Sequence, residues 1–177
     1  MRHDVDTQLD NSLTMAELEN SLNISSTYFF RFHSHSYNPL CIKDARKIRE
    51  ISGLGHEVGL HYEPDFYSMI HGNFFVGLKN ELNFLQQICG KKIVSIAPHE
   101  PCRTGIKCLD SDIKCELGVE NDAYDSKFFD NFKYISDSSC RWREGSMLEH
   151  FTSMAHRKLY VLTHPYWWYD ISPIENY

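Results

Sequence analysis

The chain has 177 residues, enough for one domain with a hydrophobic core and too few for two ordinary domains. Hydrophobic residues make up 42% and charged residues 24%, as in ordinary globular proteins, and the formal net charge of −6 argues against a nucleic-acid partner. No apolar run approaches the roughly 20 residues that a transmembrane helix needs, and the first residues lack the apolar stretch of a signal peptide. We therefore expect one domain over residues 1–177, located in the cytoplasm.

The six cysteines include no C-x-x-C pair, so the sequence does not predict a cysteine zinc site. In the cytoplasm their thiols would be reduced, because disulfides persist mainly in oxidising compartments. The chain also holds ten histidines, more than its composition requires. The positions of these histidines are therefore informative.

The first expected strand lies at the very start, in the sequence Met-Arg-His-Asp-Val-Asp. Side chains alternate along a strand, so Arg2, Asp4 and Asp6 share one face, and His3 and Val5 share the other. An unpaired buried charge is expensive, so the two carboxylates should have a cation, a metal or a substrate beside them. The alternative is a strand end whose acids are solvated. Because so few residues precede Asp4, the strand is either very short or partly missing from this chain.

Helical and strand patterns alternate along the rest of the chain. Apolar residues at helical spacing predict helices over residues 14–22, 42–51, 73–89 and 146–156, and the ambiguous stretch 107–118 is interpreted as a short helix. Runs of β-branched and aromatic residues predict strands over residues 26–32, 56–61, 93–97, 133–136 and 159–163. This alternation indicates parallel strands joined by helical crossovers, in an α/β sheet or barrel.

The first of these helices has its own start signal. Thr14 and Glu17 have the T-x-x-E spacing of a capping box, which predicts that the helix begins there. Met15, Leu18 and Leu22 fall on one side of the helix and are its expected buried stripe.

Polar clusters follow the expected strands. In parallel α/β folds, functional residues gather in the loops at the carboxyl ends of strands. His56 and His61 are five residues apart and face opposite ways on a regular strand, so we expect His61 in the site and His56 in a structural role. Clusters at successive strand ends favour one shared site: Asp4 with Asp6, His61, His99, residues 141–143, and His164.

These clusters resemble, in the same order, five motifs of the NodB-like polysaccharide deacetylases, carbohydrate esterases that remove N-acetyl groups from sugars. H-D-V-D (residues 3–6) is similar to the first motif in its divergent D-x-D form, and G-H-E-V-G-L-H (55–61) is the most specific match. P-H-E-P (98–101), S-D-S-S-C-R-W-R-E (136–144) and L-T-H-P (162–165) are similar to the remaining three. The resemblance implies a distorted, incomplete (β/α) barrel with fewer than eight strands.

The resemblance also implies a reaction, the metal-dependent removal of an N-acetyl group from an amino sugar of a glycan or glycan precursor. Asp6 and His61 would be metal ligands, and such ligands suit Zn²⁺, with Fe²⁺, Co²⁺ and Mn²⁺ as alternatives. The cation would activate water and polarise the acetyl carbonyl. Asp4 would act as the general base, and His164 as the general acid that protonates the departing amine.

One departure from the family pattern concerns the metal. The family's second metal histidine lies four residues after the position of His61, where this chain has Asp65. Aspartate can bind zinc, so the expected ligand set is Asp6, His61 and Asp65, with recruitment of His99 as the alternative.

Another departure concerns the catalytic base. The third motif normally has an arginine that fixes the base, where this chain has Glu100; Arg103 is a candidate substitute. These departures leave two other readings open. One is a non-catalytic carbohydrate-binding relative, and the other is a deformylase or amidase that acts on another C–N bond.

The substrate groove is the remaining expectation. The resemblance implies that the groove is shaped by residues that orient the substrate or Asp4, namely His99, Arg141, Trp142 and Arg143. Trp167 and Trp168 follow the last strand end, and we expect them to close the core rather than to stack on a sugar.

Overall fold

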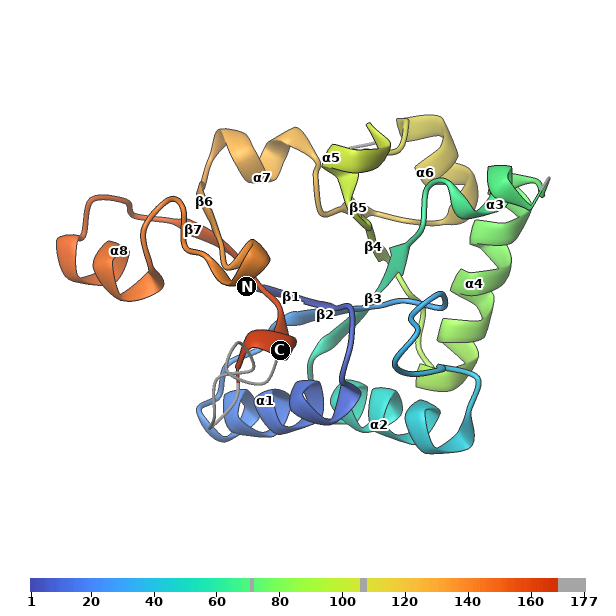
Figure 1. The fold of residues 1–177 in the computed structure, drawn as a ribbon, viewed down its shortest axis with the longest axis horizontal. Coiled ribbons are helices and arrows are strands. Elements are labelled where there is room, and N and C mark those ends of the chain that lie inside the picture. The colour runs from blue at the N-terminus through green and yellow to red at the C-terminus, as the bar shows by residue number, and fades with distance from the viewer. Residues whose placement is uncertain (71, 106–107, 169–177) are drawn as a thin grey trace.

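Seven parallel strands form one curled sheet in the computed structural model, which describes residues 1–70, 72–105 and 108–168 (Figure 1). The strand order is β5-β4-β3-β2-β1-β7-β6, so β5 and β6 are the two edges and the barrel does not close. This confirms the α/β class and the incomplete barrel. The strands are β1 (Arg2–Val5), β2 (Thr27–Phe30), β3 (Glu57–Tyr62), β4 (Ser95–Pro98), β5 (Asn121–Asp122), β6 (Lys133–Ser136) and β7 (Leu159–Thr163).

Three long helices cover one side of the sheet, and their apolar residues form the main core against β1 to β4 (Figure 1). They are α1 (Leu9–Ser21), α2 (Ile42–Gly53) and α4 (Phe74–Cys89). The short helices and 3-10 turns occupy the loops. They are α3 (Phe66–Met69), α5 (Pro101–Thr104), α6 (Ser111–Leu117), α7 (Ser126–Asp130), η1 (Ser138–Cys140), α8 (Met147–Ser153) and η2 (Pro165–Trp167).

Helix α4 is closest to its predicted bounds because both of its ends carry local signals. The side chain of Asn73 accepts a hydrogen bond from the amide of Val76 at the amino end. Gly90 ends the helix in the left-handed conformation, with φ 66°. Strands β6 and β7 have the predicted bounds, whereas the two-residue β5 was not predicted, because so short a strand leaves no periodic pattern.

Helix α1 corrects two expectations. It begins at Leu9, so Thr14 lies inside the helix and the predicted capping box is wrong. The predicted apolar stripe is also wrong, because Leu18 and Leu22 are each 60% exposed. The buried face instead includes Glu19, whose carboxylate accepts hydrogen bonds from side chains of the sheet. A tertiary contact therefore decides which face of α1 turns inward.

The segments predicted as helices near the carboxyl end are shorter than expected. Ser146 and Glu149 form a true capping box at the start of α8, and Met154 ends this helix with φ 50°. Of the stretch 107–118, Lys107 lies outside the described residues, and the helix there is α6. With β6 and β7, α8 projects from the body of the fold (Figure 1).

Strand β1 lies in the interior of the sheet although it has only four residues. It pairs with β2 on one side and with β7 on the other, so Asp4 lies beside Phe29 and His3 beside Thr163. Because all strands are parallel, their carboxyl ends share one edge. The residues that follow β1, β4, β6 and β7 therefore meet there. None of the described helices is long and apolar enough to cross a membrane; the single domain and the cytoplasmic location stay predictions.

Candidate metal and catalytic site

A pocket of about 730 Å³ opens at the carboxyl edge of the sheet. Residues from four of the five predicted clusters line it: Asp4, Asp6, His61, His99 and His164. They come from β1, β3, β4 and β7 or from the residues just after these strands. The structure thus brings together side chains that are up to 160 positions apart in the chain, from Asp4 to His164.

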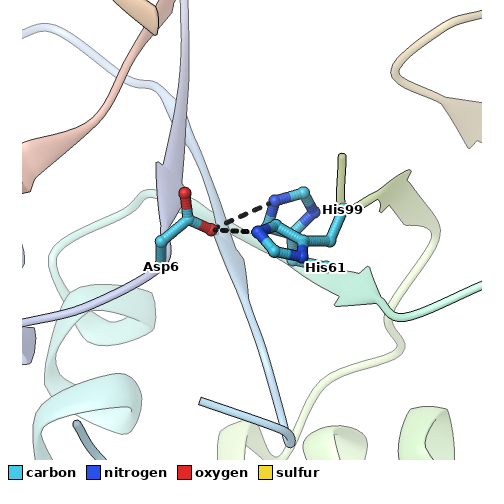
Figure 2. Close-up of side chains that lie close together, drawn as sticks. All are labelled: Asp6, His61 and His99. Atoms are coloured by element: carbon cyan, nitrogen blue, oxygen red, sulfur yellow. Dashed lines mark ion pairs between the residues drawn. The ribbon is translucent and has the colours of Figure 1, made fainter. Parts of the chain in front are cut away.

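Asp6, His61 and His99 form the tightest group in this pocket (Figure 2). Oδ1 of Asp6 lies 3.4 Å from Nε2 of His61 and 3.6 Å from Nε2 of His99. One ligand atom from each residue lies within 4.8 Å of the others. Two ligands of one tetrahedral zinc ion lie about 3.3 Å apart, because each is about 2.0–2.1 Å from the metal. The observed spacing suits a single divalent cation.

The rings of His61 and His99 are held by contacts at Nδ1, the nitrogen that does not face Asp6. Nδ1 of His61 donates to the carbonyl oxygen of Ala97 at 2.9 Å, and Nδ1 of His99 lies 3.0 Å from the carboxylate of Glu63. This assignment leaves each Nε2 with a lone pair directed at Asp6, the arrangement that metal-binding histidines use. The carboxylate of Glu63 is itself held by Arg31.

Two buried carboxylate oxygens in the pocket have no hydrogen-bond partner among the described residues. They are Oδ1 of Asp4 and Oδ1 of Asp6. Buried polar atoms are usually satisfied, so such atoms mark places that another group fills. Together with the two free imidazole nitrogens, these oxygens give an O/N donor set that fits a divalent metal ion.

The charges of the site are strongly coupled. Burial alone would raise the pKa of the Asp6 carboxyl, but His61, His164 and His99 hold this pKa well below its usual range. Burial would conversely lower the pKa of the His61 ring, but Asp4 and Asp6 raise it. The carboxylates therefore stay ionised and favour a positive charge between them, which a metal ion supplies as well as a proton does.

Arg2 holds Asp4 in place. Its Nη2 donates to Oδ2 of Asp4 at 2.7 Å, and both side chains are almost completely buried. The guanidinium lies over the ring of Tyr124, 4.7 Å from its centre, and donates to the hydroxyl of Tyr160 at 3.2 Å. Burial alone would raise the pKa of Asp4, but Arg2 lowers it. Arg2 thus makes the contact for which Arg103 was the candidate.

Asp65 is not in the group formed by the three candidate ligands, unlike the expected ligand set, and its partner Arg103 lines the same pocket as these ligands. Nη1 of Arg103 contacts Oδ2 of Asp65 at 2.6 Å, and Arg103 also pairs with Glu100. Both Arg103 and Asp65 are about half exposed. After β3 the side chain of Glu63 is buried against His99, whereas that of Asp65 is half exposed and pairs with Arg103. His99, the alternative third ligand, occupies the inner position.

Asp137 is a site residue that sequence reasoning did not single out. Its Oδ1 accepts a hydrogen bond from Nδ1 of His164 at 2.6 Å, and both oxygens accept from the His164 backbone amide at 3.0 Å. The indole of Trp168 donates to its Oδ2 at 3.0 Å. Burial alone would lower the pKa of His164, but Asp137 and the aspartates of β1 raise it. Its position inside the fourth motif was the available signal.

The remaining residues that were predicted to shape one substrate groove do not all line the same pocket. Arg141 and Arg143 line a neighbouring pocket of about 590 Å³, whereas Trp142 lines neither pocket. Trp167 lines the main pocket, and Trp168 is 46% exposed. The expectation that both tryptophans close the core is therefore wrong, because both sit at the mouth of the barrel where the chain leaves β7.

Comparison with known proteins identifies the architecture. No protein-family model matches the sequence, and no curated protein matches it. Among solved structures, BA3943 from Bacillus anthracis, a CE4 family pseudoenzyme, is 14% identical with a TM-score of 0.59, over 93% of this chain and 53% of that chain. A BA3943 mutant with restored enzymatic activity is 12% identical, with a TM-score of 0.60, over 93% of this chain and 55% of that one.

The polysaccharide deacetylase Bc1974 from Bacillus cereus is 13% identical with a TM-score of 0.59, over 93% of this chain and 77% of that chain. The present chain spans about half the length of the BA3943 structures. At these identities the likeness concerns the fold. This chain has the fold of the NodB-like, CE4 family polysaccharide deacetylases.

Proposed function

We propose that the protein is a metal-dependent hydrolase that removes an N-acetyl group from an amino sugar of a glycan or glycan precursor. The observation that carries this proposal is the convergence of Asp6, His61 and His99 in one pocket with Asp4 and His164. Ligand-type, base-type and acid-type side chains are thus within reach of one substrate group. The solved structures with this fold include polysaccharide deacetylases, which supports the choice of reaction.

Asp6, His61 and His99 would hold the divalent ion, and their oxygen and imidazole donors favour Zn²⁺. When bound, the ion supplies a Lewis acid for the acetyl carbonyl and lowers the pKa of water. Glu63 keeps His99 in the ligating tautomer by accepting from its Nδ1.

Asp4 would take the proton of the attacking water. Its Oδ2 is occupied by Arg2, so its unpartnered Oδ1 is the oxygen that accepts the proton. Because Arg2 remains charged and buried, the carboxylate keeps one orientation throughout the reaction.

His164 would give its proton to the departing amine. Asp137 fixes Nδ1, so Nε2 is the nitrogen on the pocket side, 3.8 Å from Oδ2 of Asp6. An amine is a poor leaving group unless it is protonated, and the raised pKa of His164 favours the charged imidazole that can donate this proton.

Metal analysis of single variants tests the ligand set. We expect about one divalent ion per chain in the wild type and little in His61→Ala or His99→Ala, because each removes one of three ligands. Asp65→Ala is the matched control, since its carboxylate pairs with Arg103, and it should keep the metal. Loss of metal in Asp65→Ala with retention in His99→Ala would reject this site.

Acetate release from N-acetylated amino sugars tests the reaction. Asp4→Asn should reduce the rate by about 10²–10⁴-fold, the usual contribution of a general base. Near-wild-type release by Asp4→Asn would remove Asp4 from the mechanism. Wild-type protein that binds the sugars without releasing acetate would instead be a carbohydrate-binding relative, the second candidate, which the likeness to the pseudoenzyme BA3943 supports.

A further inference from the structure

A second pocket adjoins the proposed reaction site. Its volume is about 590 Å³, and Cys102 and Ser138 line both pockets. The two cavities therefore share a wall, and the second one extends along the edge strand β6. A glycan that places one sugar over the metal ligands has room for the next unit in the second pocket.

The second pocket carries unpaired positive charge. Lys133, Arg141, Arg143 and Glu144 line it, and Lys133 pairs with Glu144 at 2.6 Å. Within the described part of the chain, no carboxylate pairs with Arg141 or Arg143. Two guanidinium groups that have no such partner among the described residues line one cavity of a chain whose net charge is −6. Guanidinium groups suit bidentate contacts with carboxylate, sulfate or phosphate.

Aromatic rings provide the other wall of this pocket. Phe129 and Tyr134 both line it, with ring centres 5.2 Å apart, and Phe129 is 37% exposed. Exposed rings beside charged groups suit a ligand that has an apolar face and an anionic substituent. A pyranose ring with an acidic group has both.

The loop that carries Arg141 and Arg143 contacts the residue that anchors His164, the proposed general acid. The amide of Arg141 donates to the backbone carbonyl of Asp137 at 3.3 Å, and Asp137 in turn anchors His164. Between them, Ser139 and Cys140 both have positive φ values, 59° and 54°, which turn the loop sharply toward the pocket wall. One short segment thus sets both His164 and the arginines.

We propose that Arg141 and Arg143 form an anion-binding subsite, so that the substrate of the deacetylase is an acidic glycan. The negative group belongs to the sugar unit next to the acetylated one, and it is a uronic-acid carboxylate or a sulfate or phosphate ester. This inference rests on the proposed function for the position of the acetylated sugar. The subsite itself rests on the charges and rings of the second pocket.

Matched acetylated oligosaccharides test the subsite, one neutral, one with a uronic acid and one with a sulfate ester at the adjoining unit. We expect kcat/KM of the wild type to be at least about tenfold higher for one acidic substrate than for the neutral one, a preference that salt weakens. In the double variant Arg141→Gln/Arg143→Gln the ratio should fall toward one. Arg46→Gln, an exposed arginine of α2, should keep the wild-type ratio.

Binding of the deacetylated forms of the same oligosaccharides, measured by calorimetry, gives a readout that does not depend on turnover. If no sugar is hydrolysed but the acidic ligands still bind more tightly through the two arginines, the proposed reaction fails and the subsite stands. Equal wild-type affinity for neutral and acidic ligands would overturn the subsite. A preference that survives in the double variant would overturn it as well.

Discussion

The two faces of β1 carry two polar clusters of opposite character. On one face His3 contacts Glu19, whose Oε1 also accepts from Ser26 and whose Oε2 accepts from Tyr28 at 2.8 Å. The other nitrogen of His3 lies 2.5 Å from the hydroxyl of Thr163. Both carboxylate oxygens of Glu19 are therefore satisfied within the protein, deep between the sheet and α1.

On the opposite face, Asp4 and Asp6 each keep one buried oxygen without a partner among the described residues. Alternate side chains of the same chain segment thus build two clusters. In the closed cluster around Glu19 every carboxylate oxygen has a hydrogen-bond partner, and in the cluster of Asp4 and Asp6 two oxygens have none among the described residues. The comparison teaches that burial and charge do not distinguish a structural cluster from a functional site. Unsatisfied carboxylate oxygens that converge on two imidazole nitrogens in one pocket do, because together these atoms leave a place for another group.

The largest effect on activity should come from removing a proposed metal ligand with Asp6→Ala. We expect metal content to fall to background and kcat/KM for deacetylation to fall by at least about 10³-fold, because the cation contributes several kcal/mol to catalysis. The metal-free protein should stay folded, with its unfolding free energy lowered by no more than about 3 kcal/mol, since Asp6 loses ion pairs with His61 and His99 but Oδ1 has no hydrogen bond to lose. Elemental analysis and urea denaturation measure the two outcomes.

The contrast between the two faces of β1 would fail on the following pair of results. The Asp6→Ala variant would be unfolded in the presence of a chelator, and without chelator its folded fraction would still contain the wild-type amount of metal. Those results would make Asp6 a structural residue like Glu19.

Asp137 sharpens the comparison because its carboxylate is satisfied like that of Glu19 and yet it anchors His164, a residue of the pocket. Asp137→Asn should lower kcat for deacetylation by about 10²-fold, because the hydrogen bond that fixes the His164 ring is weakened or reversed. Metal content should stay at the wild-type level, since Asp137 is not among the three candidate ligands. A parallel loss of metal and activity would instead show that Asp137 supports the metal site.

Local signals made much of the fold predictable. Asn73 and Gly90 mark the ends of α4, and the aromatic and β-branched run of β7 has no helical period. The start of α1 was missed because its N-cap residue, Gln8, makes no side-chain cap hydrogen bond, and its buried face was missed because contacts of Glu19 with distant residues decide the orientation of that helix. Short sequence patterns report hydrogen bonds between near neighbours and are silent about partners from other elements.

The sequence predicted which strand ends contribute to the candidate site, but not which side chains contact one another there. Strand alternation put Arg2 and Asp4 on one face, where they form an ion pair, but it did not reveal that Arg2 would stand in for the motif arginine. The choice between Asp65 and His99 depends on how the loop after β3 turns, and no local pattern specifies that turn. Asp137 went unnoticed because its partner, His164, is 27 positions away.

Glu19→Gln tests the closed cluster, with a smaller effect. The amide cannot accept on both sides as the carboxylate does, so at least one buried partner among Ser26, His3 and Tyr28 loses its hydrogen bond. We expect the free energy of unfolding to fall by about 2 kcal/mol, the scale of hydrogen bonds to charged groups. Metal content per folded molecule should stay unchanged. Glu17→Gln, on the exposed side of α1, is the matched control and should be neutral.

The smallest expected effect is the pH dependence of the difference in unfolding free energy between the wild type and Glu19→Gln. Burial alone would raise the pKa of the Glu19 carboxyl, but hydrogen bonds from His3, Tyr28 and Ser26 hold it below its ordinary value of 4.5. At acid pH the unfolded chain therefore binds more protons at this position than the folded one, so the stabilisation is complete above about pH 5 and is lost as the pH falls through the lowered pKa. Urea denaturation with a chelator present should show a constant gap between wild type and Glu19→Gln from pH 7 to about 5, narrowing below about 4. Other carboxylates titrate in both proteins, and the gap cancels them to first order. A gap that stays constant down to about pH 3 would mean that the negative charge of Glu19 contributes nothing to stability, and the lowered pKa would be rejected.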